Sequence, residues 1–497
     1  MSRGLLLVGH GSHLNAESSA PVRQHAAAIR KLGLFDEVRM GFWKEEPNLS
    51  RALDPFQSTD ITVVPVFISA GYFTNEVIPR EMGLTGEVTE IRGKTVRLTP
   101  PIGSHPALAR VILQRAREAG GEPGDTLAVL GHGTPRNPDS ERNVYAQAAN
   151  ARVLGGFREV ITVFLDQQPN MRDIFALTDA ETVVIVPLFV ADGWHVGETI
   201  PEDLALDGPE TRRDGRRLRY AGAVGTHPSV VDVILELAGA RERPATNGAG
   251  KLEPPWYDLH IDGMGVDWGM PFWQFRVHRD RQGLILHPLA HNGEPIQGEE
   301  IGLDEVADRC RYDDLGRYRP LSGALTAPTG WYARFNERQQ AEKILDDLYP
   351  LGPLHWLQWE DRELRIVSLD DVLNRQTGRY GNAKDLSHDG REAARWALCD
   401  HMCDRAPLWA EGDLTQYKLD PWAVTSEDCV MNGDVPCPEP CSVFVSLCRE
   451  AAIWERERPE PAPVDQEIAW AAFDEPGNEV REAYLQLRYG DTVSSDG

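Results

Sequence analysis

The sequence predicts an α/β protein in which two tandem copies of one parallel-sheet fold precede a small α+β domain and a helical, cysteine-rich domain. A series of motifs recurs at a constant offset of 122 residues, the spacing from His10 to His132. Short apolar runs alternate with helical stretches inside each copy, as in a parallel sheet covered by helices. After residue 245 the composition changes, and six of the seven cysteines follow residue 390.

The repeat needs no gap between His10 and His105. The matching segments are 7–12 with 129–134, 47–48 with 169–170, 64–67 with 186–189, 78–79 with 200–201, and 103–106 with 225–228. Gly71 and Glu76 also fall on Gly193 and Glu198. Residues 1–121 and 122–245 are therefore predicted to be two lobes of one fold.

The order of elements within lobe 1 predicts where its ligands bind. Strands are expected at residues 5–8, 38–42, 61–67 and 96–99, and helices at 20–32 and 105–116. Pro106 suits the first turn of the second helix. Ligands of parallel sheets bind beyond the carboxyl ends of the strands, where the Gly-His-Gly turn is expected to lie.

The formal charge of −26 disfavours nucleic acid and anionic membranes as partners. The apolar run at 5–8 is shorter than a signal-peptide core, so we expect a cytoplasmic protein. A linker ending at residue 250 precedes an α+β domain at 251–390, and the cysteine-rich domain spans 391–497.

Polar side chains in lobe 2 form a candidate catalytic and metal site. His132 follows the first strand, and His195 lies in the segment after Pro187. Two neutral imidazoles hold a divalent transition metal or accept protons near neutral pH. Glu198 or Asp166 would orient an imidazole or complete the ligands.

Structural roles compete with these functional ones. A histidine between glycines can simply cap a turn, although the repeat retains one at both His10 and His132. His105 and His227 precede proline at a helix start and are expected to cap or pack. Glu76 and Glu198 can equally be solvated acids near a helix start.

These motifs, in order and present twice, resemble the CbiX-type sirohydrochlorin chelatases over about residues 4–240. The resemblance implies two flavodoxin-like lobes facing each other across a cleft, which insert Co(II) or Fe(II) into a tetrapyrrole. The family's catalytic histidines map onto His132 and His195 of lobe 2, and His10 is the lobe 1 counterpart of His132.

Lobe 1 departs from the family pattern. Phe73 stands where the second histidine would be. The glutamate that the family often carries before the second-strand motif is replaced by Trp43 and Leu165, so Asp166 or Glu45 would take its place. Three arginines near the motifs would pair with substrate carboxylates or are solvated: Arg136, Arg142 and Arg172.

The cysteine cluster predicts a [4Fe–4S] site, with structural zinc and unmodified thiols as alternatives. Cys399 and Cys403 are expected on one face of a helix. Some long CbiX-type chelatases carry a C-terminal iron–sulfur segment, which favours the cluster by resemblance. Its candidate ligands are Cys399, Cys403, Cys429, Cys437, Cys441 and Cys448. Cys310 stands apart and is expected in a core.

The favoured function is that of a sirohydrochlorin chelatase with a tetrapyrrole and a divalent metal as partners. One alternative is a non-catalytic tetrapyrrole- or metal-binding iron–sulfur protein that acts as a redox or iron sensor. Another is an electron-transfer partner of a tetrapyrrole enzyme. The oligomeric state is left open.

Overall fold

The computed structural model divides the chain into two compact units, Met1–Pro254 and Pro255–Gly497. It describes residues 2–12, 15–133, 138–240, 271–272, 275–279, 284–288, 298–312, 329–335, 338–352, 354–355, 358, 363–400, 403, 405–409, 435–457 and 479–489.

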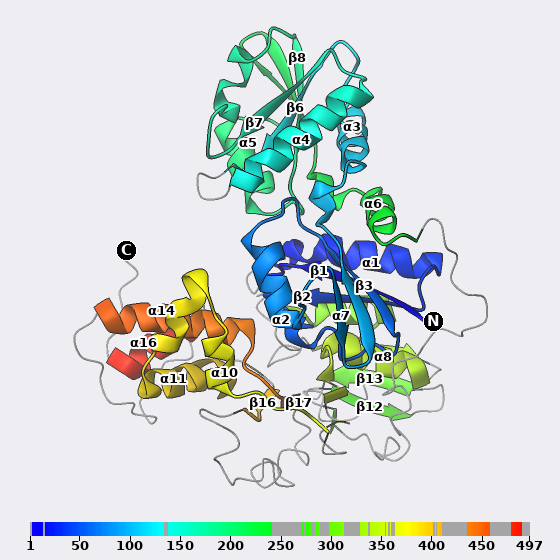
Figure 1. Ribbon diagram of the computed structural model, residues 1–497. Helices are drawn as coiled ribbons and strands as arrows, with labels where there is room; N and C mark the ends of the chain where they lie inside the picture. Colours follow the sequence, from blue (N-terminus) through cyan, green and yellow to red (C-terminus); the bar gives the residue numbers. More distant parts are fainter. Residues whose placement is uncertain are drawn as a thin grey trace. The chain divides into compact units, whose positions relative to one another are not determined.

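The first unit contains two five-stranded sheets of the same topology, which confirms the predicted pair of α/β lobes (Figure 1). The strand order is β2-β1-β3-β5-β4 in lobe 1 and β7-β6-β8-β10-β9 in lobe 2. In lobe 1 the strands are β1 (Arg3–Gly9), β2 (Glu37–Phe42), β3 (Asp60–Pro65), β4 (Val88–Ile91) and β5 (Lys94–Leu98). In lobe 2 they are β6 (Thr126–Gly131), β7 (Glu159–Phe164), β8 (Thr182–Pro187), β9 (Glu210–Arg213) and β10 (Arg216–Tyr220).

One edge strand of each sheet differs from the expected parallel arrangement. β4 pairs antiparallel with β5, and β9 pairs antiparallel with β10, whereas the other pairs are parallel. Positive φ angles at Arg92-Gly93 and Asp214-Gly215 make the tight turns of these hairpins. The Asp-Gly pair was the sequence signal for this unpredicted hairpin.

Helices cover the sheets, and a π-helical turn lies at the same place in both lobes. In lobe 1 they are α1 (Ala20–Leu32), η3 (Phe73–Val77), α2 (Ile78–Met82), η4 (Ile102–Ser104) and α3 (Leu108–Glu118). In lobe 2 they are α4 (Pro138–Leu154), η6 (His195–Thr199), α5 (Ile200–Asp203), η7 (Val224–Thr226) and α6 (Val230–Leu237).

The last helix of each lobe packs on the other lobe. Helix α3 follows the lobe 1 sheet but lies against α4 and β8 of lobe 2, and α6 lies against α1 of lobe 1 (Figure 1). Buried residues of both sheets therefore share one continuous hydrophobic core. Because the chain leaves each sheet from the carboxyl end of β5 or β10, those edges lie at the junction between the lobes.

A glycine marks each crossing between the lobes. A Cβ on Gly103 would lie 1.7 Å from the carbonyl oxygen of Ile68, and one on Gly225 would lie 2.2 Å from that of Val190. Neither position can accept a side chain without displacing backbone. This close approach explains why the repeated Gly-Ser/Thr-His-Pro motif begins with glycine.

Buried side chains at repeat-related positions hold these crossings. The His25 Nε2–H donates to the Gly225 carbonyl oxygen at 2.8 Å, and the Gln147 amide donates to that of Gly103 at 2.7 Å. His25 and Gln147 occupy the same place in α1 and α4, so the junction has approximate twofold symmetry in its hydrogen bonds.

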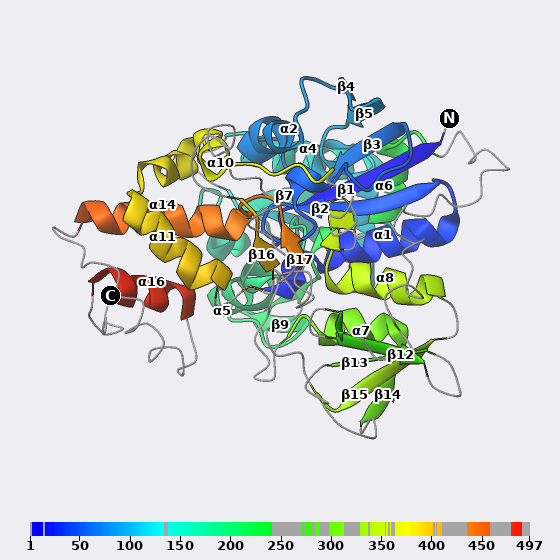
Figure 2. The same ribbon diagram turned by 90° about the horizontal axis from the view of Figure 1, so that it is seen from below.

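The second unit begins with a mixed sheet, in the order β11-β12-β13-β15-β14. Its strands are β11 (Pro271–Phe272), β12 (Phe275–Arg279), β13 (Leu284–Pro288), β14 (Glu299–Ile301) and β15 (Trp331–Phe335). Helices α7 (Leu303–Arg309) and α8 (Arg338–Leu348) lie on one face of it (Figure 2). Cys310 is buried in their shared core, as expected.

Helices and one pair of short strands make up the rest of the residues that the structure describes in this unit. They are α10 (Leu369–Asn374), η10 (Gly378–Asp385), α11 (His388–Arg395), η11 (Trp396–Asp400), β16 (Arg405–Pro407), β17 (Val435–Cys437), α14 (Ser442–Glu457) and α16 (Glu479–Tyr489). Since α10 and η10 share a core with α14, and Ile366 packs against that core, we propose that the cysteine-rich domain begins near residue 366, rather than at the predicted 391. Within the described ranges, no helix has the length and apolarity needed to span a membrane.

The buried His25 makes the junction sensitive to acid. Burial, the largest influence, lowers the pKa of His25, and nearby His227 acts in the same direction. Below about pH 6.5, His25 is therefore protonated in the unfolded chain but still neutral in the folded chain. The free energy of unfolding consequently falls as the pH drops through that value.

We expect His25→Gln, which copies Gln147, to keep the bond to Gly225 and to lose less stability on acidification. The measurement is the midpoint of the transition that unfolds the lobes, in urea at about pH 7.5 and about pH 5.5. Equal losses in the wild type and the variant would show that His25 is not the acid-sensitive group.

Candidate functional site

His132 lies directly after β6, at the edge of the lobe 2 sheet that meets the junction. Its Nδ1–H donates to the carbonyl oxygen of Gly133 at 2.8 Å. A carbonyl oxygen accepts hydrogen bonds and cannot donate them, so this bond fixes the tautomer and leaves a lone pair on Nε2. Gly133 has a φ of 69°, and a Cβ there would lie 2.6 Å from Gln167.

His195 and Asp166 reach the same place from the ends of neighbouring strands. The His195 ring, at the start of η6, lies 5.0 Å from the His132 ring at an interplanar angle of 84°. Asp166, which follows β7, places its Oδ2 3.4 Å from His132 Nδ1. Two imidazoles and a carboxylate thus converge beyond three parallel strands.

The electrostatics of the pair favour neutral imidazole. Burial, followed by the proximity of His132, lowers the pKa of His195, and Asp166 opposes this shift. A neutral ring can donate a lone pair to a metal or accept a proton. Across the described part of the chain, no three His, Cys, Asp or Glu side chains form a complete metal site. His132, His195 and Asp166 are therefore not arranged as a ready three-ligand metal site in this structure.

Glu198, a predicted catalytic residue, is exposed in η6. The carboxylate that lies beside the His pair is that of Asp166, so the catalytic role of Glu198 stays a prediction. Glu76, its counterpart in lobe 1, is exposed in η3.

Lobe 1 presents different chemistry at the corresponding edge. His10 has the same bond, from Nδ1–H to the carbonyl oxygen of Gly11 at 2.8 Å. Its ring neighbour is Phe73 at 5.2 Å, and Phe73 stacks on Phe67 at 5.0 Å. Lys44 occupies the place of Asp166 and is buried. An ammonium and a phenyl ring thus replace a carboxylate and an imidazole, which disfavours a cation here.

Other predicted residues have partners of their own. Glu45 is buried and accepts from Arg23 at 3.0 Å, so it is not the carboxylate beside a histidine pair. Arg172 pairs with Asp203 at 2.5 Å. Arg142 is exposed on α4, and Arg136 lies outside the described residues.

His105 and His227 cap helix starts, as predicted. The Nδ1 of His105 accepts from the Ala107 N–H at 3.3 Å, and the Nδ1 of His227 accepts from the Ser229 N–H at 3.0 Å. His227 also contacts Glu118 of α3 at 3.1 Å, so its second nitrogen joins the lobes.

Three of the candidate cluster cysteines lie near one another. Burial raises the pKa of the Cys403 thiol, and neighbouring Cys437 and Cys441 act in the same direction. Cys399 lies within the π turn η11, and Cys403 lies beyond the end of that turn. The prediction that both thiols share one helix is therefore wrong, because the helical turn stops before the second cysteine.

The remaining cysteines differ in setting. Cys399, Cys437 and Cys441 pack at the border of the hydrophobic core of their domain. Cys448 is completely buried within that core on α14, which is typical of a packing residue. Cys429 lies outside the described residues.

The first unit is thus a two-lobed α/β protein with a doubled sheet and paired imidazoles beyond the strands of one copy. The CbiX family model matches residues 4–119 and 126–240. A probable sirohydrochlorin cobaltochelatase of Halobacterium salinarum is 43% identical over 271 residues, which are 49% of this chain and 92% of that protein. The chain belongs to the CbiX family.

Further similarities cover single lobes and the second unit. A sirohydrochlorin cobaltochelatase of Methanosarcina barkeri is 35% identical over 125 residues, 23% of this chain and 95% of that protein. Residues 361–450 match a 4Fe-4S iron-sulfur cluster binding domain. The crystal structure of DR2241 from Deinococcus radiodurans, described as similar to chelatases with two additional domains, has a TM-score of 0.76. It is 27% identical and covers 91% of this chain and 100% of its own.

We expect His195→Phe, which copies Phe73 of lobe 1, to remove one Co(II) binding site per chain by removing an imidazole lone pair. Equilibrium dialysis with Co(II) measures the change in stoichiometry. The matched control is His388→Phe, whose exposed imidazole on α11 contacts Glu392 at 3.6 Å. Unchanged Co(II) stoichiometry in His195→Phe would place the metal elsewhere.

Proposed function

We propose that the protein is a sirohydrochlorin chelatase that inserts Co(II) or Fe(II) into the macrocycle at the lobe 2 edge. The observation that carries this proposal is the His132–His195 pair with Asp166 alongside. Cobalt is the favoured ion because the relatives named above are cobaltochelatases. Nitrogen and carboxylate donors accept either ion, so the assay compares both.

The ligand set suits delivery of a metal rather than its storage. A closed site of four thiolates would retain the ion, whereas two imidazoles with open positions allow exchange. We infer that Nε2 of His132 and a ring nitrogen of His195 hold the incoming ion. The hydrogen bond from Nδ1 of His132 to Gly133 keeps the ring oriented during this step.

Metal insertion must also release two protons. The divalent ion replaces two pyrrole N–H protons, so the net charge of the macrocycle is unchanged and two protons leave. We infer that His195, whose lowered pKa favours the neutral ring, accepts one of them once the ion has passed from the ring to the macrocycle, and that water takes the second. Asp166 is close enough to stabilise the resulting imidazolium of the pair.

Exposed aromatic residues beside both π turns support a planar substrate. Tyr72 and Trp194 occupy related positions immediately before η3 and η6, and they are 47% and 66% exposed. A conjugated macrocycle offers them a π face on which to pack.

The cysteine-rich domain is proposed to hold a [4Fe–4S] cluster through Cys399, Cys403, Cys437 and Cys441. The burial of Cys403 beside Cys437 and Cys441 fits such a group, since cysteines gathered in one partly buried place are its usual ligands. When bound, the cluster supplies one-electron chemistry. Cys437 and Cys441 border the start of α14, so they would tie that helix to the segment after η11.

The insertion reaction is tested by anaerobic absorbance of sirohydrochlorin with protein and either ion. We expect a metal-dependent spectral change faster than the protein-free control, and its loss in His132→Ala and His195→Ala. His388→Ala serves as the matched control. Tight tetrapyrrole binding without accelerated insertion would contradict the chelatase proposal and favour the binding or sensor alternative.

The cluster ligands are tested by iron content and visible absorbance after anaerobic reconstitution. We expect about four irons per chain in the wild type. Cys403→Ser and Cys441→Ser should lose both the iron and the absorbance, because each removes a thiolate. Cys448→Ala should retain the iron, since that thiol packs in the core. Loss of iron in Cys448→Ala or in Cys429→Ser, with retention in Cys403→Ser, would overturn this ligand set.

A further inference from the structure

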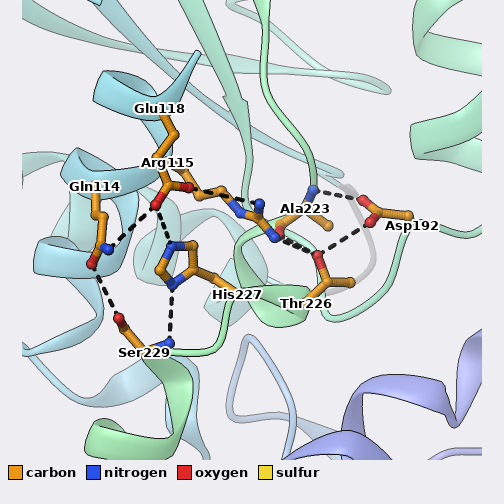
Figure 3. Close-up of polar contacts among 8 residues, drawn as sticks. All are labelled: Gln114, Arg115, Glu118, Asp192, Ala223, Thr226, His227 and Ser229. Carbon is orange, nitrogen blue, oxygen red and sulfur yellow. Dashed lines mark hydrogen bonds and ion pairs between the residues drawn. The ribbon is translucent and has the colours of Figure 1, made fainter. Parts of the chain in front are cut away.

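The turn that carries His195 is anchored on its amino-terminal side by Asp192. Asp192 Oδ1 accepts from the Ala223 N–H at 2.6 Å, and its Oδ2 lies 3.1 Å from the Thr226 hydroxyl (Figure 3). Ala223 and Thr226 belong to the crossing segment around η7. The loop before η6 is therefore tied to the place where the chain passes between the lobes.

A residue from the other lobe's last helix extends this anchor. Arg115 of α3 donates to the Thr226 hydroxyl oxygen at 2.6 Å, and Figure 3 shows Arg115, Thr226 and Asp192 in one line of contacts. Glu118, one turn further along α3, lies 4.0 Å from Arg115. Helix α3 thus reaches the His195 loop through one hydroxyl group.

The carboxyl-terminal side of the turn is held by Tyr220. Its hydroxyl donates to the carbonyl oxygen of Val196 at 2.8 Å. Burial raises the pKa of Tyr220, and Asp192 acts in the same direction, so the hydroxyl stays protonated as a donor. His195 therefore sits between two anchors, one from each flank.

The other repeat copy has a different residue at each of these positions. At the 122-residue offset, Asp192 corresponds to Ala70, Ala223 to Pro101, Arg115 to Leu237 and Tyr220 to Leu98. Alanine and leucine supply no polar group, and proline has no N–H to donate. The lobe 1 loop is held instead by Asn143 of α4, which donates to the carbonyl oxygen of Ile68 at 2.7 Å, and by Thr74, which bonds locally to Gly71. The contacts made by Asp192 and Tyr220 thus occur only beside the turn that carries the second histidine.

We propose that Asp192, Thr226, Arg115 and Tyr220 are positioning residues that hold the His195 turn so that its imidazole faces His132. This inference rests on the proposed chelatase function. None of the four needs to touch metal or tetrapyrrole. Residues of this kind behind metal ligands typically change metal affinity or activity by about ten- to a hundred-fold when removed.

The test uses substitutions that the repeat itself supplies. Asp192→Ala and Arg115→Leu each install the residue found at the same position of the other repeat copy, and Tyr220→Phe removes one hydroxyl group. Thr226→Ser copies Ser104 and keeps the hydroxyl. The control for a general effect on the junction is Gln114→Ala. Gln114 lies on α3, as Arg115 does, and the substitution removes its contact with Ser229, the residue just before α6.

Three measurements separate positioning from folding. Asp192→Ala and Tyr220→Phe should lower kcat for insertion and weaken Co(II) binding by about ten-fold or more, with little change in KM for the tetrapyrrole. The absorption spectrum of bound Co(II) should change. Amide hydrogen exchange should quicken at residues 190–199 and stay constant at 68–77, the lobe 1 counterpart.

Each outcome decides the proposal. Wild-type rate, Co(II) spectrum and exchange in Asp192→Ala and Tyr220→Phe would overturn it, as would equal effects in Gln114→Ala. Thr226→Ser should behave as the wild type, and a loss equal to that of Asp192→Ala would contradict the role of the hydroxyl. If the wild type inserts no metal, the chelatase proposal fails, and exchange at 190–199 alone decides whether the anchors hold the turn.

Discussion

The close passage of backbone at Gly103 and Gly225 is the constraint on which the rest of the first unit depends. At each crossing the chain leaves one sheet and delivers its last helix to the other, with too little space for even a methyl group. The exchanged helices complete a core that neither sheet encloses alone. Since both crossings start from strand carboxyl ends, the same geometry brings the edge with His132 and His195 to the junction.

Much of this fold could be predicted from the repeat. For the parts that could not be predicted, the cause is physical. The 122-residue repeat places matching strands, turns and histidines in both copies, which predicts two equivalent sheets. It does not reveal the helix exchange, because α3 and α6 present equivalent apolar faces whichever sheet they cover. The edge strand β4 escaped notice because it is short and largely exposed. In the second unit, α10 shares a core with α14, and the apolar spacing of Leu369, Val372 and Leu373 indicates a helix without indicating which domain it joins.

The site was partly predictable for a similar reason. His132 stands out because it recurs in register as His10, and His195 because it follows the repeated segment after Pro187, whereas the residue pattern alone did not decide between Asp166 and Glu198. The closeness of Asp166 to His132 depends on the pairing of β6 with β7, which is a property of the sheet. The repeat aligns Lys44 of lobe 1 with Asp166 of lobe 2. Lobe 1 therefore has a positive charge where lobe 2 has a negative one.

The exchange of α3 and α6 has a consequence for any fragment of this protein. A gene half encoding one lobe would yield a sheet with an uncovered face and a helix with no surface of its own to cover. Two such halves would complete each other by trading helices across a twofold axis, as a swapped dimer. In the full chain the two halves are joined covalently. Because they are parts of one sequence, the strand edges of the two lobes can carry different residues, whereas two identical chains related by a symmetry axis would carry the same ones.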